Sequence, residues 1–314
     1  MFKTKEKIPL KNLYAMNEFV KRTLSAAVYA AVVVSSILVN RFYFGAVFLL
    51  VTLLAVREYM VLMKASKGMT VATMLTGGLL FVSGFFLTLA FVEVMGNRLD
   101  QFLFLGIGGA CLCLCMVLGI PVAQVFAHSE HATHNRQLLW QALWEIAMPL
   151  TMTNLLLGMS PYCLLMVFIT IWVNDTGAYI VGCTTAKLLP RGNHKMCPSI
   201  SPAKSWEGLA GGFLFTLMAA WVFMRIGWLA DAFLDGYVPS VNGWHVVVFA
   251  LVIASAATLG DLMESQLKRS VGVKDSGCFM PGHGGVLDRF DSILFAVPVW
   301  CMVALLVSVV QSVL

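Results

Sequence analysis

Two aspartates stand at the ends of long apolar runs, where a carboxylate is costly to place. Asp175 follows the apolar run that includes Ile171–Asn174, and Asp261 follows Thr258–Gly260. An ionisable residue at or inside a membrane boundary is retained mainly for function, so both aspartates are candidate site residues. Each stands next to a segment rich in charge, glycine and proline, which favours a polar site over an ordinary solvated loop.

Two long loops, about 183–206 and 264–291, and the helix ends beside them hold much of the charge of the chain. The acidic members are Asp175, Glu207, Asp261, Glu264, Asp275, Asp288 and Asp291. The basic members are Lys187, Arg191, Lys195, Lys204, Lys268, Arg269, Lys274 and Arg289. This mixture suits a magnesium–phosphate site, because Mg²⁺ takes one or two carboxylates and leaves positions for phosphate oxygens. Lys and Arg then neutralise the remaining phosphate charge.

Asp288 and Asp291 lie three residues apart, so on a helix they share one face. Asp288 opens the last apolar run of the chain, and the N-terminus of a helix favours phosphate. A metal ion between the two carboxylates would offset their repulsion. The alternative is that they only cap the helix. Capping accounts for one of them, but not for the charged and glycine-rich segment that precedes them.

The segment Pro281–Gly285 has three glycines in the order Pro-Gly-His-Gly-Gly. Glycine lets the backbone approach a ligand closely and exposes amide groups to phosphate, although a plain tight turn has the same composition. Its His283 is open to three roles, as a general base, a phosphate contact or a structural donor. Contact with phosphate or positioning is favoured, since phosphoryl transfer depends mainly on positioning and charge neutralisation.

The elements that must hold these residues are membrane helices. Of the 314 residues, 59% are apolar and 12% charged, against about 45–50% and about 25% in soluble domains. The apolar residues fall in runs long enough to span a bilayer, which excludes disorder, collagen and coiled coil. The net charge of +5 is then explained by helix orientation, and no nucleic-acid partner is expected.

The fold is predicted to be an all-α polytopic membrane protein with about nine spans. They cover roughly 23–40, 43–63, 70–93, 102–126, 137–157, 161–182, 207–228, 243–263 and 292–313. In this topology Arg41, Arg98 and Arg225 lie on one side of the membrane, and the other Lys and Arg residues lie on the opposite side. The positive-inside rule therefore places the N-terminus in the cytoplasm and the C-terminus outside.

The stretch from Ser265 to Asp291 closely resembles the signature of the phosphatidate cytidylyltransferase (CDP-diacylglycerol synthase) family. That pattern is Ser-x-apolar-Lys-Arg, Lys-Asp, Pro-Gly-His-Gly-Gly and Asp-Arg-x-Asp. The residues that fall on it are Ser265, Lys268, Arg269, Lys274, Asp275, Pro281, Gly282, His283, Gly284, Gly285, Asp288, Arg289 and Asp291.

Further segments are similar to other motifs of that family: Gly260–Ser265, Asn174–Tyr179 with Gly182, and Ser201–Gly208. Residues of about 160–314 match, whereas 1–160 match only as apolar helices. Three parts are expected: a basic cytoplasmic leader over 1–22, a transmembrane bundle over 23–160, and a catalytic transmembrane part over 161–314.

The resemblance implies that CTP and phosphatidic acid give CDP-diacylglycerol and pyrophosphate, with Mg²⁺ and room for a second cation. It implies metal ligands at Asp261 and Asp288 first, and at Asp291 and Asp275 second. The catalytic set would be Asp288, Asp261, Lys268, Arg269, His283 and Arg289. The substrate-binding set would be Lys274, Lys204, Ser201, Gly284, Gly285 and Asp175. It also implies membrane lipid as a partner, a homodimer, and a site on the cytoplasmic side of a bacterial inner membrane.

Three alternatives stay open. One is a cytidylyltransferase or kinase acting on another lipid phosphate or on a polyprenol. Another is a transporter, which many spans and buried charges would suit. A transporter is expected to have internal repeats and ionisable residues at mid-membrane, whereas here the charges gather at one face and no repeat is evident. The third is a catalytically silent scaffold, against which the complete set of charged motif residues argues.

Overall fold

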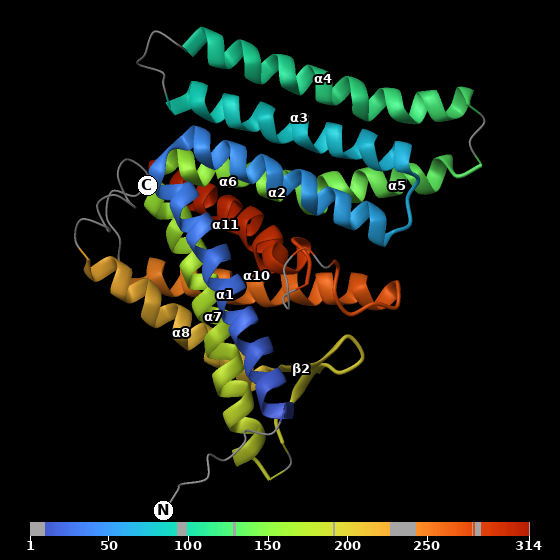
Figure 1. Cartoon of the computed structure of the whole chain (residues 1–314). Coiled ribbons are helices and arrows are strands. Elements are labelled where there is room, and N and C mark those ends of the chain that lie inside the picture. The colour runs from blue at the N-terminus through green and yellow to red at the C-terminus, as the bar shows by residue number, and fades with distance from the viewer. Residues whose placement is uncertain are drawn as a thin grey trace, which may run out of the picture.

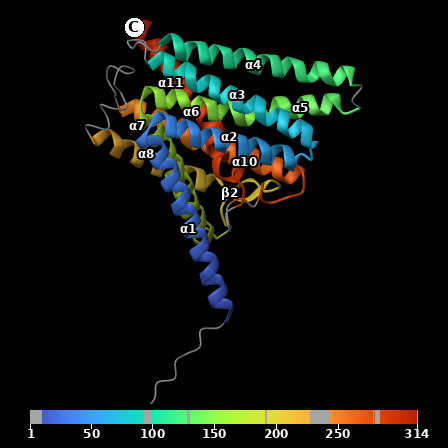
Figure 2. The same ribbon diagram turned by 45° about the horizontal axis from the view of Figure 1, so that its top comes forward.

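The computed structural model describes residues 10–92, 99–127, 130–190, 192–226, 243–277, 279 and 284–313. Among these, the side chains of 10–19, 99, 100 and 307–313 lie outside the description. The chain is an all-α polytopic membrane protein, as predicted, with eight helices that are long and apolar enough to cross a bilayer. In Figures 1 and 2, α2, α3 and α4 run side by side with α5 and α6, and α1 and α7 cross them steeply.

The elements follow one another with short connections in the first half of the chain. In order they are α1 (Leu10–Val39), α2 (Arg41–Leu62), α3 (Lys67–Val92), α4 (Leu99–Phe126), α5 (Ala132–Ala142), η1 (Leu143–Ala147), α6 (Met148–Met159), α7 (Pro161–Leu188), β1 (Lys195–Cys197), β2 (Ser201–Ser205), α8 (Trp206–Arg225), α10 (Gly243–Ser270) and α11 (Leu287–Val313).

The span expected at 137–157 falls on α5, η1 and α6, which follow one another without a break. The middle segment is a π-helical turn, in which the amide of Met148 bonds to the carbonyl of Leu143. A π-turn inserts one residue and rotates the side chains that follow it. None of these three segments is by itself long enough to cross a bilayer, so the count of nine spans and the sides of the two termini stay predictions.

The expected bounds of the two long loops are wrong at their ends. α7 continues to Leu188, α10 continues to Ser270, and α11 begins at Leu287 rather than near 292. The apolar runs mark the part of each helix that lies in lipid, whereas the helices themselves extend into charged sequence, because Lys, Arg and Glu are good helix formers. The signature residues Glu264–Arg269 are therefore helical, and the connections shrink to 189–205 and 271–286.

The first of these connections contains a hairpin that the sequence analysis did not expect. β1 and β2 pair antiparallel, with Lys195 opposite Ser205 and Cys197 opposite Ser201 across an irregular register. The hairpin leads directly into α8, where Ser205 is the N-cap and accepts a hydrogen bond from the amide of Gly208 at 3.1 Å. The short strands thus fix the start of a spanning helix.

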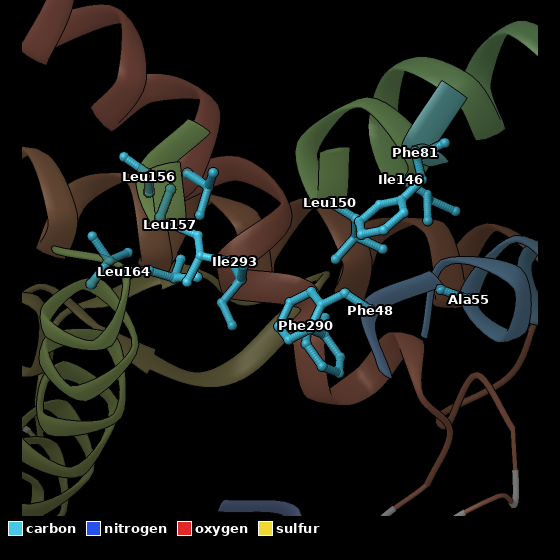
Figure 3. Packing of buried hydrophobic residues seen from close by; sticks show 14 of the residues in the cluster. Phe48, Ala55, Phe81, Ile146, Leu150, Leu156, Leu157, Leu164, Phe290 and Ile293 are labelled. Atoms are coloured by element: carbon cyan, nitrogen blue, oxygen red, sulfur yellow. The ribbon is translucent and has the colours of Figure 1, made fainter. Parts of the chain in front are cut away.

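A cluster of aromatic rings joins helices from the two halves of the chain. Phe48 of α2, Phe168 of α7 and Phe290 of α11 meet edge to face, with ring centroids 5.9 to 6.5 Å apart. Phe48 and Phe290 are labelled within the buried cluster in Figure 3, beside side chains of α6. Edge-to-face pairs add about 0.5–1.5 kcal/mol each beyond burial. The first turn of α11 is therefore held between early and late helices, and the division at residue 160 stays a prediction.

Helices α10 and α11 are in close contact at Gly260. A Cβ atom there would lie 2.7 Å from the carbonyl oxygen of Asp291 and 3.0 Å from the Cβ of Phe295, both in α11. Backbone cannot move aside as a flexible side chain can. This glycine therefore sets the distance between the helices that carry Asp261 and Lys268 on one side and Asp291 on the other.

Replacing Gly260 with Ala is expected to force α10 and α11 apart and to destabilise the protein by about 1–3 kcal/mol, the usual cost of overpacking. The measurement is the midpoint of thermal unfolding in detergent. Gly108→Ala in α4 is the matched control, because nothing lies within 4 Å of a Cβ atom at that position. An equal midpoint for Gly260→Ala and wild type would show that the two helices do not meet at this point.

Candidate active site

Three carboxylates meet where the C-terminal part of α10 faces the first turns of α11. Asp261 and Glu264 lie on α10, and Asp291 lies on α11. One ligand oxygen from each falls within 4.8 Å of the others, so the three could hold a metal ion. Asp261 and Asp291 are half-buried, whereas Glu264 is only 6% exposed. We call these three residues the carboxylate cluster.

Glu264 is a member that the proposed metal set did not include. Its Oε2 atom pairs with the ammonium group of Lys268 one turn later. Its buried Oε1 atom has no hydrogen-bond partner among the described residues. The spacing of Asp261 and Glu264, three residues apart on one helix face, is the signal in the sequence that could have identified it.

Lys268 joins α10 to α11. Its Nζ atom lies 2.7 Å from Oδ1 of Asp288 and also pairs with Glu264, and the residue is only 9% exposed. The resemblance placed Lys268 in the catalytic set. The structure instead places it between two buried carboxylates, where it balances charge within the protein.

Both carboxylate oxygens of Asp288 accept hydrogen bonds. Lys268 takes Oδ1, and Oδ2 accepts hydrogen bonds from the amide of Ser276 at 2.9 Å, its hydroxyl at 2.9 Å, and the amide of Gly285 at 2.8 Å. These bonds hold the connection between α10 and α11 against the start of α11. The role of Asp288 as a metal ligand stays a prediction, and it would require some of these bonds to exchange.

Gly284 has a backbone conformation that few other residues adopt. Its φ angle is +83°, and a Cβ atom there would collide with the carboxylate of Asp288. The glycine therefore lets the chain close around Asp288 so that the next amide, that of Gly285, can donate to it. The glycine-rich segment thus binds a carboxylate of the protein itself at this point.

The hairpin brings a second lysine to the carboxylate cluster. The Nζ atom of Lys204, at the end of β2, lies 2.8 Å from Oδ2 of Asp261 and donates to the carbonyl of Thr258 at 3.0 Å. Arg269 reaches the same hairpin, since its Nε donates to the carbonyl of Ile200 at 3.4 Å. Ser201 opens β2 and is half-buried.

His194 was not among the predicted site residues, but it binds the connection before α8 to the first turn of that helix. His194 Nδ1 lies 2.6 Å from an oxygen of Glu207, and the backbone amide of His194 donates to both carboxylate oxygens at 3.0 Å. Glu207 stands in the first turn of α8, where a carboxylate also complements the helix dipole. This contact holds the residue before β1 against the first turn of α8, and the hairpin between them carries Lys204.

Asp175 and Arg289 lie beside the carboxylate cluster. Asp175, on α7, is close enough to Asp261, Lys204 and Arg289 to interact with them electrostatically. The buried Nε of Arg289 has no hydrogen-bond partner among the described residues. Tyr29 of α1 donates its hydroxyl to the carbonyl of Arg289 at 3.1 Å, so the N-terminal helix also reaches the site.

Comparison with known proteins identifies the family. The sequence model of the cytidylyltransferase family matches residues 20–307. The chain belongs to this family. A phosphatidate cytidylyltransferase of Staphylococcus saprophyticus is 42% identical over 135 residues, which cover 43% of this chain and 46% of that protein. One from Haemophilus influenzae is 39% identical over 140 residues, which cover 44% of this chain and 43% of that protein. In each case the matched stretch is less than half the length of the bacterial relative.

Membership of the cytidylyltransferase family suggests a divalent cation, and the carboxylate cluster fits one. Mg²⁺ prefers carboxylate oxygens, and the cluster offers three of them. The buried Oε1 of Glu264 is an acceptor that lacks a partner in the described part of the protein. A buried, unpaired carboxylate oxygen is costly, and a cation would remove that cost.

Other predicted site residues are exposed or lie outside the described residues. Lys274 and Asp275 are exposed, and Asp275 is not one of the three grouped carboxylates. Arg269 is also exposed, and its Nη1 donates to the carbonyl of Val273 at 2.9 Å. His283 lies outside the described residues, as do its neighbours Pro281 and Gly282, Arg191, and residues 1–9 of the leader.

Replacing Lys268 with Met is expected to destabilise this cytidylyltransferase-family protein by about 3–5 kcal/mol, because two buried carboxylates would lose their cation. Unfolding in detergent, followed by heat or by added denaturant, measures the loss. Arg269→Met is the control, since this neighbouring side chain is exposed and surface changes stay within about 0.5 kcal/mol. If both variants unfolded like the wild type, Lys268 would not carry the buried charge balance.

Proposed function

We propose that this chain transfers the cytidylyl group of CTP to phosphatidate, giving CDP-diacylglycerol and pyrophosphate. The observation that carries the proposal is the carboxylate cluster of Asp261, Glu264 and Asp291, flanked by Lys204 and Lys268. Membership of the cytidylyltransferase family supports the transfer of a nucleotide. The names of the bacterial relatives support phosphatidate as the acceptor.

In this reaction an oxygen of the phosphatidate phosphate attacks the α-phosphorus of CTP. The bond from that phosphorus to the oxygen bridging it to the β-phosphorus breaks, and pyrophosphate leaves. Both substrates are anions, so the main task of the site is to bring them together against their repulsion. Positioning and charge neutralisation supply most of the catalysis in such transfers.

The carboxylate cluster would hold the divalent cation, for which we propose Mg²⁺. Asp261 and Asp291 keep their place as ligands from the sequence analysis, and Glu264 joins them. Asp288 and Asp275 remain further candidates, as does a second cation. When bound, the cation supplies positive charge against the substrate phosphates.

Lys204 and Lys268 are proposed to act differently. Lys204 is part-exposed and pairs with Asp261 from the hairpin, so it can turn from the carboxylate to a nucleotide phosphate. Lys268 is buried between Glu264 and Asp288, so it stays in place and sets the geometry. Ser201, on the same hairpin as Lys204, is proposed to donate to phosphate.

Arg289 is proposed to bind the lipid phosphate, because its buried Nε is without a hydrogen-bond partner among the described residues. Asp175 would orient Arg289 and Lys204 by charge. Arg269 and Lys274, both exposed, are proposed for the triphosphate or the leaving pyrophosphate. His283, Gly284 and Gly285 are proposed to line the phosphate site, as the resemblance implies.

The site is proposed to lie at the cytoplasmic face of a bacterial inner membrane, in a homodimer. The hairpin leads into the N-terminal end of α8 and carries Lys204 to Asp261 of α10. Lys268 of α10 in turn reaches Asp288 at the N-terminal end of α11. An active site at that face would take CTP from the cytosol while the acyl chains of phosphatidate stay in the bilayer.

Purified protein in detergent, given radiolabelled CTP, Mg²⁺ and phosphatidic acid, is expected to form labelled CDP-lipid. Asp261→Asn is expected to lower the rate at least about 100-fold, since electrostatic groups of active sites contribute on that scale. Asp288→Ala is expected to lose activity as well, because it frees Lys268 and the connection before α11.

The control for this assay is Glu130→Gln, which changes an exposed carboxylate before α5, outside the site. It should retain the wild-type rate. An Asp261→Asn variant as active as the wild type would refute the site. If even the wild type forms no labelled lipid from phosphatidic acid, a panel of other lipid phosphates and polyprenols identifies the acceptor.

The proposed topology predicts which engineered cysteines react from each side of the membrane. In a variant without the native cysteines, Glu130→Cys should react with an impermeant thiol reagent in inverted vesicles, where the cytoplasmic face is outside. Gly243→Cys, at the start of α10, should react only in intact spheroplasts. The reverse pattern would invert the topology and move the site to the outer face.

A further inference from the structure

Glu58 is a buried carboxylate in the last part of α2, and the sequence motifs do not include it. It is 9% exposed. Among the described residues, no Lys or Arg forms an ion pair with it. Its Oε2 atom instead accepts a hydrogen bond from the amide of Leu287 at 2.9 Å and one from the hydroxyl of Ser276 at 3.4 Å.

The bond to Leu287 satisfies an amide that the helix itself cannot pair. Leu287 is the first residue of α11 and is buried, and the first four amides of a helix have no partner within it. The positive end of the helix dipole also favours a carboxylate there. Glu58 therefore acts as a cap supplied by a helix 229 residues earlier in the chain.

The connection before α11 passes very close to Glu58. A Cβ atom on Gly277 would lie 2.8 Å from Oε1 of Glu58, and one on Gly285 would collide with Oε2. Two glycines of this connection thus lie against one carboxylate, and a side chain at either position would push the connection away from Glu58.

A series of contacts links Glu58 to the carboxylate cluster. The hydroxyl of Ser276 lies between Glu58 and Asp288, at 3.4 and 2.9 Å. Asp288 is paired with Lys268, and Lys268 is paired with Glu264 of the cluster. A shift of the connection away from α2 would therefore change the position of Asp288 and the balance of charge at Lys268.

We propose that Glu58 is a positioning residue for the reaction. It fixes Ser276, Gly285 and Leu287 against α2, so that Asp288 and Lys268 stay in their catalytic arrangement. The carboxylate is needed for its charge as well as its length. The neutral amide of Gln can still place an oxygen at the position of Oε2, but it accepts weaker hydrogen bonds and no longer complements the positive end of α11. The kinetic part of this proposal rests on the cytidylyl transfer proposed above.

The test compares Glu58→Gln with the wild type in two measurements. Well below the unfolding midpoint, kcat for CDP-lipid formation should fall at least about tenfold while KM for CTP and phosphatidate stays within about twofold, because Glu58 touches neither substrate. In hydrogen–deuterium exchange, the amides of Ser276, Gly285 and Leu287 should exchange faster in the variant. A residue that only stabilises the fold would lower the midpoint and leave kcat unchanged at this temperature.

Thr52→Val is the matched control. Thr52 is buried on the same helix, and within the described part of the chain its hydroxyl bonds only to the carbonyl of Phe48 in α2. This variant should keep the wild-type kcat and exchange rates. Ser276→Ala combined with Glu58→Gln should lose less than the sum of the two single variants, because the two residues share one contact.

Several results would overturn the positioning role of Glu58. Wild-type kcat in Glu58→Gln, or fully additive losses with Ser276→Ala, would overturn the positioning role. If Glu58→Gln does not fold, Gly285→Ala moves the connection off Glu58 from the other side, and wild-type kcat there would overturn the role equally. If the wild type forms no CDP-lipid, the proposed function fails, while unchanged exchange at Leu287 would separately refute the anchoring by Glu58.

Discussion

The buried ion pairs of Lys268 are the constraint on which the rest of the site depends. One ammonium group on α10 faces Glu264 of its own helix and Asp288 of α11. Buried charges are tolerated when they are paired, and removing one partner leaves the others uncompensated. Because one lysine serves two carboxylates, and Asp261 and Asp291 lie alongside, the region keeps an excess of negative charge. This excess is what suits it to a cation and then to phosphate.

That arrangement depends in turn on how closely two helices approach. Gly260 lets the backbone of α10 touch that of α11. The ring of Phe290 in the first turn of α11 also packs edge to face on Phe48 (Figure 3) and on Phe168. Both helices continue past their apolar runs, so the charged residues stand on rigid helix rather than on loop. Groups held on rigid elements keep their geometry better than groups on loops.

The motifs of the second half made much of this site predictable from sequence. Asp261, Asp291 and Lys204 were singled out by type and position, and the structure brings them together. Glu264 was absent from the expected metal set. Asp288 was in that set, but its oxygens accept from Lys268, Ser276 and Gly285. Spacing along a chain tells which residues share a helix face, but not which of two nearby carboxylates is already paired.

The contacts that the first half of the chain makes with the site could not be predicted from the sequence. Glu58 follows Arg57 near the end of an apolar run, and by local pattern it is indistinguishable from an ordinary boundary charge. Its partners are 218 and 229 residues away, and no periodicity reports such distances. Tyr29 likewise reaches the backbone of Arg289 from α1. Helices that carry no motif thus supply a carboxylate and a hydroxyl to the segment that holds the motif.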